Sequence, residues 1–482
     1  MHVSDARPSA VIILAAGEGT RMRSALPKVM HPIGGRSLIG HAIAAARATG
    51  TDHLTVVVRH ERDRVAEHIT AIDAACTIAD QDEVKGTGRA TECGLDALPA
   101  DLSGTVLVTM GDVPLLQGET LVALAEDHAS SGSAVTVITS VLPDAKSYGR
   151  IVRAADGSVE RIVEFKDATD AQREIREINS GIYAFDAELL RTALTQVTTE
   201  NASGEKYLTD VVGLAREAGR RVSAMPVDDL WQTEGANDRV QLADLGAELN
   251  RRTCERWMRE GVTIVDPATT WIDVDVTIGR DTTIRPSTQL LGATTIGERA
   301  VVGPEVTLTD TEVGDDARIR RTEAEHAVVG AEASVGPFSY LRAGTVVGRG
   351  GKVGGFVETK NATIGEGAKV PHLTYCGDAQ IGDGANIGAG TIFANYDGVA
   401  KHRTTIGRHS FVGSNSVLVA PVDIADGAYV AAGSAVTEDV APGQMAVARG
   451  RQSNHDGWVA TRRAGTPTDA AAQAAGTTTQ ED

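Results

Sequence analysis

The C-terminal half of the chain repeats an aliphatic residue every six positions, and this repeat limits the fold more than any other feature of the sequence. The spacing holds from about Ile264 to Val436 and is seen in the pairs Ile278 and Ile284, Ile296 and Val302, Val329 and Val335, and Ile424 and Val430. A glycine commonly follows the aliphatic residue, where we expect it to relieve backbone strain at a turn. Neither a helical period nor strict alternation fits the region. The pattern predicts a left-handed parallel β-helix of roughly ten coils, if three hexapeptides make one coil.

Size and composition agree with a chain of several domains. The 482 residues predict two or three domains, and an apolar content of 42% is enough for real cores. Aromatic residues make up only 4%, which suits the narrow, aliphatic interior of a β-helix. The net charge of −19 argues against a nucleic-acid partner, because binding to a phosphate backbone needs a basic surface. Anionic substrates would therefore need local cations or a metal ion.

The cysteines and the N-terminus indicate where the protein works. Four cysteines, Cys76, Cys93, Cys254 and Cys376, are widely spaced and form no CxxC pair, so we expect free thiols in a reducing cytoplasm. The apolar run from Val11 to Ala16 is too short for a signal peptide, and no run reaches the length of a membrane span. We therefore expect a cytoplasmic protein without membrane insertion.

A glycine-rich turn follows the first strand expected in the chain. Residues 11–14 predict a buried strand, and it runs directly into Ala-Ala-Gly-Glu-Gly-Thr-Arg-Met at positions 15–22. Such a turn can place backbone N–H groups around a phosphate. It is neither a Walker A loop nor a GxGxxG fingerprint, since Met22 stands at the third glycine position. A glycine-rich turn alone is usually structural, but Arg21 and Lys28 add cations nearby.

The rest of the N-terminal half alternates between strand and helix patterns. We expect strands at 54–58, 105–110 and 135–139, and helices at 41–48, 63–69 and 119–129. This order predicts a doubly wound, Rossmann-like α/β domain, in which ligands bind at the carboxyl ends of the strands. Gly17 and Asp112 follow two such ends and would face one crevice. Asp112 would then lie where a metal–phosphate complex binds, although a Gly-Asp pair after a strand is more often only a turn.

Two stretches outside these domains also have distinct patterns. Residues 239–260 read as one long helix with Leu242, Leu245 and Leu249 on its buried side and Gly261 as its C-terminal stop. From Ala464 to Asp482 the chain is rich in small and polar residues, so we expect it to be disordered. We expect Trp458, just before this tail, to pack on the β-helix or on a neighbouring subunit.

Motifs in the first half resemble those of a known family. The segment LAAGEGTRM followed by LPK is similar to the sugar-nucleotide pyrophosphorylases. Joined to the hexapeptide array, the chain from about residue 10 to 460 resembles the bacterial bifunctional enzymes that combine N-acetylglucosamine-1-phosphate uridyltransferase with glucosamine-1-phosphate acetyltransferase. The resemblance implies a tail at 1–9, a uridyltransferase domain at 10–237, a linker helix at 238–261, a β-helix acetyltransferase domain at 262–452 and a mostly disordered tail at 453–482.

The resemblance also implies two reactions. The β-helix domain would acetylate glucosamine 1-phosphate with acetyl-CoA. The N-terminal domain would transfer uridylyl from UTP to N-acetylglucosamine 1-phosphate and release pyrophosphate. The product, UDP-N-acetylglucosamine, would feed peptidoglycan and other envelope precursors. A homotrimer is implied as well, with acetyltransferase sites at the subunit boundaries.

Site residues of the first half are carried over motif by motif. The resemblance assigns Asp112 and Asn237 to Mg²⁺, and it places Gln81 at the uracil. The full set for UTP and UDP-N-acetylglucosamine is Leu14, Ala15, Ala16, Gly17, Arg21, Lys28, Gln81, Gly86, Thr87, Gly149, Glu164, Asn179 and Asn237. Tyr148 and Arg150 flank Gly149 in the motif expected around the acetamido sugar. Singly, each residue has a simpler explanation: Asn237, for example, would cap the next helix. One departure is Asp238, where the family often has a second Asn.

In the β-helix the resemblance assigns His372 as general base. A histidine with an ordinary pKa of about 6.5 is mostly neutral at cytoplasmic pH and can accept a proton from the substrate amine. Glucosamine 1-phosphate would be held by Arg342, Lys360, Tyr375 and Asn386, and acetyl-CoA by Ala389, Asn395, Tyr396, Ser414, Ala432 and Arg449. We expect residues 393–404 to form a loop outside the coil. Asn361 stands where the family often has a second lysine, so phosphate affinity would be somewhat weaker.

Two other functions fit the same architecture. One is a single-function sugar-nucleotide pyrophosphorylase with a structural β-helix, and the other is a non-catalytic interaction protein. The joint presence of Arg342, Lys360 and His372 speaks against the first. The presence of Lys28 and Asp112 speaks against the second.

Overall fold

The structure is a computed structural model that describes residues 7–477. It divides into two compact units, one up to residue 316 and the other from residue 317. The boundary falls inside the hexapeptide region rather than at the predicted linker helix. Each unit is described by itself.

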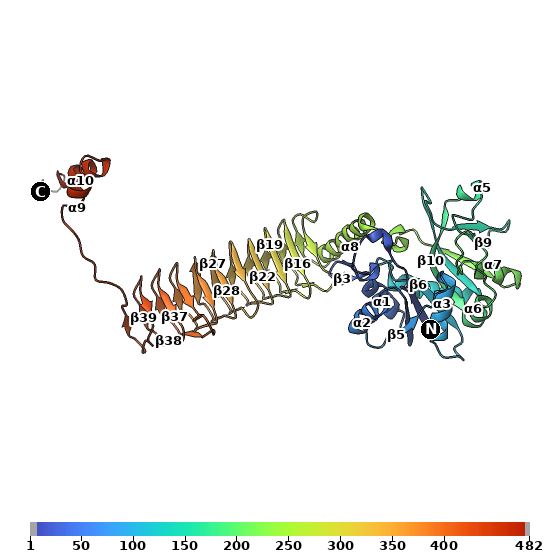
Figure 1. Ribbon diagram of the computed structural model, residues 1–482, viewed down its shortest axis with the longest axis horizontal. Helices are drawn as coiled ribbons and strands as arrows, with labels where there is room; N and C mark the ends of the chain where they lie inside the picture. Colours follow the sequence, from blue (N-terminus) through green and yellow to red (C-terminus); the bar gives the residue numbers. More distant parts are fainter. Residues whose placement is uncertain (1–6, 478–482) are drawn as a thin grey trace. The chain divides into compact units, whose positions relative to one another are not determined.

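A mixed sheet forms the centre of the first unit (Figure 1). Its strand order is β11-β7-β10-β6-β1-β4-β5. The bounds are β1 Ala10–Leu14, β4 His53–Val58, β5 Thr77–Asp80, β6 Thr105–Met110, β7 Val135–Val141, β10 Glu177–Asp186 and β11 Val222–Pro226. Strand β1 runs parallel to β4 and β6, whereas β10 lies antiparallel between β6 and β7. The predicted Rossmann-like domain is confirmed, and β10 runs antiparallel to its neighbours within the sheet.

Helices cover both faces of this sheet. Their bounds are α1 Leu38–Ala48, α2 Arg62–Ile72, α3 Thr87–Asp96, α4 Gly118–Ser131, α6 Ala187–Leu194 and α7 Asp210–Glu217. Successive residues of a strand point to opposite faces, so Ile12 packs in the core with α3, α6 and α7, and Ile13 packs in the core with α1, α2 and α4. Burial on both faces explains why β1 is a continuous apolar run.

A small hairpin extends the sheet beside β10. It consists of β8 (Arg150–Arg153) and β9 (Val159–Val163), and Arg150 of β8 pairs with Ile178 of β10. The short helix α5 (Asp170–Arg173) follows it and begins with a capping box formed by Thr169 and Gln172. This arrangement places the Tyr148–Gly149 turn next to Asn179.

The long helix α8 spans Arg239–Arg259, close to the predicted 239–260. Its N-cap is Asp238, whose carboxylate accepts hydrogen bonds from the N–H groups of Val240 and Gln241, each at 2.9 Å. The departure from the family's second Asn therefore supplies a good cap. Leu245 is buried against Ile33 and Leu115, with Leu242 and Leu249 beside it.

The first coils of the β-helix belong to the first unit. Their strands are β12 (Thr263–Ile264), β15 (Thr283–Ile284) and β18 (Val301–Val302) in one sheet, β13 (Trp271–Ile272), β16 (Thr288–Leu291) and β19 (Val306–Thr309) in the second, and β14 (Thr277–Ile278), β17 (Thr295–Ile296) and β20 (Glu312–Val313) in the third. Asn250 of α8 donates to Thr270 O at 2.8 Å and accepts from Ile272 N at 3.0 Å. Val274 N donates to Gly34 O at 2.9 Å, in the turn between β2 (Pro32–Ile33) and β3 (Arg36–Ser37). These contacts explain why the first coils group with the α/β domain.

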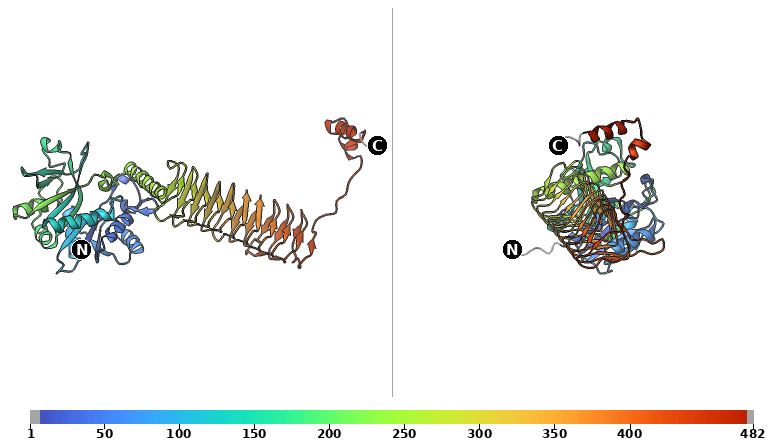
Figure 2. Two further views of the ribbon diagram at one scale, coloured as in Figure 1. Left: turned by 180° about the vertical axis from the view of Figure 1, so that it is seen from behind. Right: turned by 90° about the vertical axis from the view of Figure 1, so that its left-hand side faces the viewer.

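Three parallel sheets continue the coil in the second unit (Figure 2). The first contains β21 (Arg318–Ile319), β24 (Ser334–Val335), β27 (Lys352–Gly355), β30 (Lys369–His372), β33 (Asn386–Ile387), β36 (Phe411–Val412), β39 (Tyr429–Val430) and β41 (Met445–Ala446). The second contains β22 (Thr322–Glu325), β25 (Ser339–Leu341), β28 (Glu358–Lys360), β31 (Tyr375–Gly377), β34 (Ile392–Ala394), β37 (Val417–Val419) and β40 (Ala435–Val436). The third contains β23 (Val328–Val329), β26 (Val346–Val347), β29 (Thr363–Ile364), β32 (Ala379–Ile381), β35 (Thr404–Ile406) and β38 (Val422–Ile424). Val335 pairs with Val353, which pairs with Val370, so the buried aliphatic residues stack coil on coil. The left-handed parallel β-helix predicted from the repeat is confirmed.

The glycines of the repeat act differently from the prediction. The glycine after the aliphatic residue, such as Gly382, does not have a left-handed backbone. A Cβ there would lie only 2.7 Å from Arg408 N of the next coil, so glycine permits the coils to approach closely. The left-handed positions come later in the turn and are often not glycine, as at Asp281 and Glu332. Close packing, not turn strain, explains the repeated glycine.

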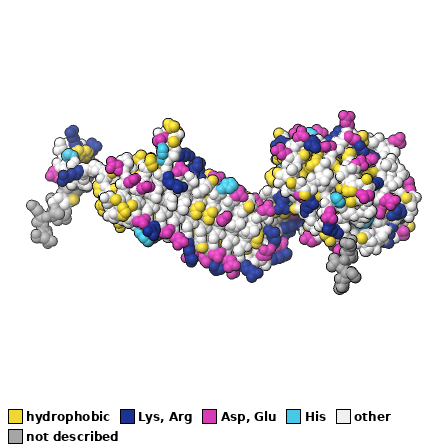
Figure 3. Space-filling model, turned by 90° about the horizontal axis from the view of Figure 1, so that it is seen from below, with side chains coloured by type: hydrophobic (Ala, Val, Ile, Leu, Met, Phe, Trp, Pro, Cys, Tyr) yellow, Lys and Arg dark blue, Asp and Glu magenta, His cyan; other side chains and the backbone are white. Residues whose placement is uncertain are grey.

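Charged side chains of both signs are interspersed over the coil face seen in Figure 3. Many pair between successive coils: Arg408 Nη2 lies 2.8 Å from Asp426 Oδ2, and Arg299 Nη2 lies 2.9 Å from Asp316 Oδ2. Such exposed ion pairs contribute little to stability. Among the described residues, no helix is both long enough and apolar enough to cross a membrane.

The C-terminal region differs from the predicted disorder. Helices α9 (Trp458–Arg462) and α10 (Pro467–Thr477) are described there, and the alanine-rich composition that suggested disorder also favours helix. Trp458 is 49% exposed and lies under the Arg463 guanidinium at 5.3 Å. A local contact therefore replaces the expected packing on the β-helix, while packing on a neighbouring subunit stays a prediction. Residues 478–482 of the predicted tail, and residues 1–6 of the predicted N-terminal tail, lie outside the described residues.

Candidate active sites

A cleft of about 760 Å³ opens at the carboxyl ends of β1 and β6. Nine of the predicted residues line it: Leu14, Ala15, Ala16, Gly17, Lys28, Gln81, Gly86, Thr87 and Asp112. Arg59, His60, Lys85 and Glu205 also line it and were not predicted. Arg59 and His60 follow the end of β4, and Lys85 and Glu205 come from two other loops, so only the fold brings them to one cleft. The position agrees with the rule that ligands bind at strand ends in such sheets.

Four predicted polar side chains meet at one edge of this cleft. Lys28 Nζ makes an ion pair with the Asp112 carboxylate and donates to Asn237 Oδ1 at 3.2 Å. Arg21 Nη2 donates to the same Asn237 oxygen at 2.9 Å. One cation thus contacts both the carboxylate and the amide oxygen, so the two oxygens face a common point. A divalent cation that prefers oxygen ligands and keeps several waters, such as Mg²⁺, fits this donor pair.

Backbone contacts fix the two oxygen donors relative to each other. Ala236 N donates to Asp112 O at 3.0 Å, and Asn237 N donates to Gln241 Oε1 at 2.8 Å. A Cβ on Gly235 would lie 3.4 Å from Asp112 Oδ2, so this glycine permits the close approach. The sequence reasoning missed Gln241, although its position four residues after Asn237 on α8 is a usable signal.

The start of α3 is held against residues 206–208. Gly86 has a φ of +115°, and a Cβ there would lie 2.3 Å from Lys206 O. Gly88 N donates to Lys206 O at 2.8 Å, and Leu208 N donates to Thr87 Oγ1 at 3.1 Å. Gln81 Nε2 donates to the carbonyls of Val84 and Gly86. The predicted residues Gln81, Gly86 and Thr87 therefore form one rigid wall.

Gly149, Glu164 and Asn179 come together around β8, β9 and β10. A Cβ on Gly149 would lie 3.5 Å from both Glu164 Oε1 and Asn179 Cβ. Asn179 Oδ1 accepts hydrogen bonds from Tyr183 Oη at 2.8 Å and from Gly181 N at 3.0 Å. Burial raises the pKa of Glu164 above its usual value, opposed by a hydrogen bond from Thr209. These residues thus form a compact polar cluster.

Tyr148 and Arg150 flank Gly149 and make hydrogen bonds of their own within this region. Arg150 is buried and donates to the backbone carbonyls of Ala145, Lys146 and Tyr148. It therefore holds the turn, and its expected place around the sugar stays a prediction. Tyr148 Oη donates to Glu234 Oε2 at 3.1 Å, a partner that no motif indicated.

In the second unit two predicted cations lie on successive coils. Leu341 pairs with Thr359, so Arg342 and Lys360, the next residues, occupy equivalent positions. Arg342 Nη1 lies 3.0 Å from Glu358 Oε1. The pKa of Lys360 is lowered by Lys401 first and by Arg342 next. Lys401, which was not predicted, thus brings a third cation to this surface.

His372 ends β30, and its side chain is exposed. Its carbonyl accepts from Gly390 N at 3.1 Å, which places Ala389 one coil further along. Lys369 pairs with Asn386, so the predicted Asn386 also lies one coil away from β30. Tyr375 begins the next strand, β31.

Asp378 links several of these residues and was missed. It accepts hydrogen bonds from Asn395 Nδ2 at 2.5 Å and from Asn361 Nδ2 at 2.7 Å. Asn395 Nδ2 also lies 3.5 Å from Tyr375 Oη. Asn361, where the family often has lysine, therefore has a structural partner in this chain.

The predicted acetyl-CoA residues form a column along the coil. Asn415 N donates to Ala389 O and Gly433 N donates to Ser414 O, both at 2.8 Å. Arg449 Nη1 donates to Ala432 O at 3.1 Å. Ala389, Ser414 and Ala432 thus occupy equivalent positions on successive coils.

The predicted loop is shorter than expected. Phe393 and Thr404 are buried in β34 and β35, so the chain leaves the coil only at residues 395–403. Phe393 takes the core position that an aliphatic residue takes in other coils, so the hexapeptide pattern did not predict this strand. Tyr396, in this loop, is 60% exposed.

Comparison with known proteins covers both halves of the chain. Residues 11–173 match the family model of the MobA-like NTP transferase domain. A bifunctional protein GlmU of Micrococcus luteus is 58% identical over 489 aligned positions, covering 99% of this chain and 98% of the relative. The bifunctional proteins GlmU of Paenarthrobacter aurescens and Streptomyces avermitilis are 58% and 56% identical and cover 97% and 98% of this chain, and 95% and 98% of their own lengths.

Proposed function

This chain belongs to the family of bifunctional GlmU proteins, and on that basis we propose how its two sites carry out uridyl transfer and acetyl transfer. The chain is both a uridyltransferase and an acetyltransferase, and the two activities together make UDP-N-acetylglucosamine. The observation that carries the assignment of the first site is the convergence of Asp112, Lys28 and Asn237 beside a nucleotide-sized cleft.

In uridyl transfer a phosphate oxygen of N-acetylglucosamine 1-phosphate attacks the α-phosphorus of UTP. A new P–O bond forms, the bond to the bridging oxygen breaks, and pyrophosphate leaves. Both reactants are anions, so alignment and charge neutralisation supply most of the catalysis. Arg21 and Lys28 neutralise the phosphates, and Asp112 and Asn237 would hold Mg²⁺. When bound, the metal spreads the charge of the departing pyrophosphate.

Other residues of the first site bind and orient the substrates. Residues 14–17 surround the nucleotide phosphates, while Gln81, Gly86 and Thr87 contact the uracil. Gly149, Glu164 and Asn179 surround the acetamido sugar. The support is their position in the cleft or in the compact polar cluster around β8, β9 and β10.

Acetyl transfer takes place on the β-helix. His372 accepts a proton from the amine of glucosamine 1-phosphate, and the nitrogen attacks the thioester carbonyl of acetyl-CoA. The C–N bond forms, the C–S bond breaks, and coenzyme A leaves as a thiol. Arg342 and Lys360 bind the sugar phosphate, and Tyr375 and Asn386 orient the acceptor. The residues proposed for acetyl-CoA are Ala389, Asn395, Tyr396, Ser414, Ala432 and Arg449.

We propose a homotrimer in which each acetyltransferase site lies at a subunit boundary. The support is the exposed position of His372 and Tyr396 on a single copy, which leaves them accessible to a neighbouring chain. Sedimentation equilibrium would give a mass of three chains of 50.3 kDa each. A monomer mass at micromolar concentration would contradict the trimer.

Parallel assays test the two reactions. Pyrophosphate release from UTP and N-acetylglucosamine 1-phosphate is compared with thiol release from acetyl-CoA and glucosamine 1-phosphate. His372→Ala should lower thiol release by roughly 100- to 10,000-fold and leave pyrophosphate release unchanged. Asp112→Asn should do the reverse. A folded wild-type protein that releases no thiol would favour a single-function pyrophosphorylase with a structural β-helix.

A further inference from the structure

One segment connects the linker helix to the proposed metal pair. We call residues 229–237 the strap. It begins at Asp229 beside α8, includes the short helix η3 (Leu230–Thr233), and ends at Asn237. Its last residues carry Glu234, which accepts from Tyr148, and Ala236, which donates to Asp112 O. The strap therefore holds one proposed metal ligand and touches the other.

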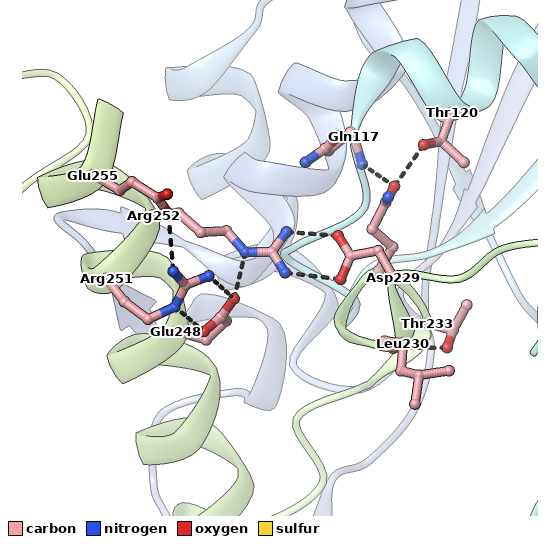
Figure 4. A network of polar contacts seen from close by, with 10 residues as sticks. Gln117, Thr120, Asp229, Leu230, Thr233, Glu248, Arg251, Arg252 and Glu255 are labelled. Atoms are coloured by element: carbon pink, nitrogen blue, oxygen red, sulfur yellow. Dashed lines mark hydrogen bonds and ion pairs between the residues drawn. The ribbon is translucent and has the colours of Figure 1, made fainter. Parts of the chain in front are cut away.

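The strap is fixed at its first residue by a two-pronged ion pair from α8 (Figure 4). Arg252 Nη1 donates to Asp229 Oδ2 and Arg252 Nη2 donates to Asp229 Oδ1, both at 2.8 Å. The two side chains are only 23% and 34% exposed. Two parallel hydrogen bonds fix direction as well as distance, which a single lysine contact does not.

Arg252 is itself held in place. Its Nε donates to Glu248 Oε1 at 2.7 Å. The Glu248 carboxylate also accepts hydrogen bonds from Arg251 Nε and Nη2, each at 2.8 Å. These arginines lower the pKa of Glu248 to about 2, so its carboxylate stays charged. The guanidinium of Arg252 is therefore oriented before it meets Asp229.

A second anchor holds the middle of the strap. Gln232 Oε1 accepts from Thr120 Oγ1 at 2.6 Å and from Gln117 N at 3.2 Å, at the start of α4. Only three residues, Thr233 to Gly235, separate this anchor from Ala236, whose N–H group donates to Asp112 O. With both anchors in place, the position of Asn237 follows from the backbone.

We propose that Arg252 is a positioning residue for uridyl transfer: through Asp229 it sets the strap so that Asn237 faces Asp112 across the metal position. The proposal rests on the function proposed above. Loss of the two-pronged ion pair between Arg252 and Asp229 would let the start of the strap shift. The amide oxygen of Asn237 would then face the metal position for a smaller fraction of the time. Removing such indirect support typically lowers metal affinity by roughly 10- to 100-fold.

The test measures metal binding without turnover. Mn²⁺ binding to the full chain with UTP, in the absence of the sugar phosphate, is followed by loss of the free-ion EPR signal. Arg252→Gln and Asp229→Asn should each weaken Mn²⁺ binding by roughly 10- to 100-fold, and Arg252→Lys by less. In steady-state assays the same variants should raise the Mg²⁺ concentration for half-maximal pyrophosphate release. Thiol release should stay at the wild-type level.

A matched control is Arg259→Gln, which removes another ion pair of α8, that between Arg259 and Glu255. It should leave Mn²⁺ binding unchanged. If Arg252→Gln lowers the unfolding temperature but binds Mn²⁺ as tightly as the wild type, the two-pronged ion pair is only structural and the proposal is wrong. If the wild type itself releases no pyrophosphate, the proposed function fails. Mn²⁺ binding by the variants would still show whether Arg252 positions the strap.

Discussion

At the scale of single residues, the buried carboxyl of Glu164 predicts a measurable dependence of stability on pH. Its pKa is raised by burial first, with nearby Asp167 and Asp210 adding to the effect. Between the ordinary and the raised pKa the folded state holds more protons than the unfolded state, so stability falls as pH rises through that window. Glu164→Gln removes this loss. Its unfolding free energy in urea should exceed that of the wild type more at about pH 8 than at about pH 5.

The control for this prediction lies on β9, the strand that ends just before Glu164. Glu160 is exposed on β9, so Glu160→Gln should change the unfolding free energy little and equally at both pH values. A stability gain of Glu164→Gln that is the same at both pH values would contradict the assignment to a raised pKa. The variant should also raise the KM for N-acetylglucosamine 1-phosphate, because Glu164 lies in the polar cluster proposed to surround the sugar.

Motifs predicted the residues that meet at the cleft but not the residues that support them. Lys28, Asp112 and Asn237 lie 209 positions apart at most, and their order alone suggested a common site. The hydrogen bond of Gln241 to Asn237 N spans only four residues and was overlooked, whereas the bonds of Asp378 to Asn361 and Asn395 join neighbouring coils and are marked by no sequence motif. A single sequence therefore yields the groups expected to touch substrate and misses the groups that hold them.

At the scale of elements, the sequence predicted strands and helices well because their periods are local. Strand β6 has the predicted bounds, and α8 ends one residue earlier than expected. The glycines of the repeat were assigned correctly to the coil but for a different physical reason. Their role depends on the backbone of the next coil, about eighteen residues away at three hexapeptides per coil, which no local pattern reveals.

Gly86 offers a test at this scale. Its φ of +115° is strained for any other residue, and a Cβ would lie 2.3 Å from Lys206 O. Gly157 has a φ of +83° but no atom within 4 Å of the Cβ position. Gly157→Ala should cost about 1–2 kcal/mol of unfolding free energy from backbone strain alone. Gly86→Ala should cost more and should also raise the KM for UTP, because the wall of the cleft must move.

Comparing the two variants separates the cost of backbone strain from the cost of the steric clash with Lys206 O. Equal losses of unfolding free energy in Gly86→Ala and Gly157→Ala, with an unchanged KM for UTP, would show that the contact with Lys206 does not matter. Urea unfolding gives the first quantity, and pyrophosphate release at varied UTP gives the second.

At the scale of the whole molecule, the sequence predicted the order of the domains but not where the two compact units divide. The linker helix was expected to separate two domains, yet the first coils group with the α/β domain. The cause is a set of long-range hydrogen bonds, such as those of Asn250 with Thr270 and Ile272. Side-chain partners of this kind depend on the folded arrangement, so sequence periodicity cannot place the boundary.

The two proposed reactions have different needs for metal, and this difference gives a prediction for the full chain. Asp112 and Asn237 present oxygens to one point beside the cleft, whereas acetyl transfer needs only a neutral base and a thioester. EDTA in excess should therefore abolish pyrophosphate release and leave thiol release unchanged, because a general base acts without a metal. Adding Mg²⁺ beyond the chelator should restore the first activity. Equal loss of both activities, or persistence of both, would contradict the assignment of a metal to the first site alone.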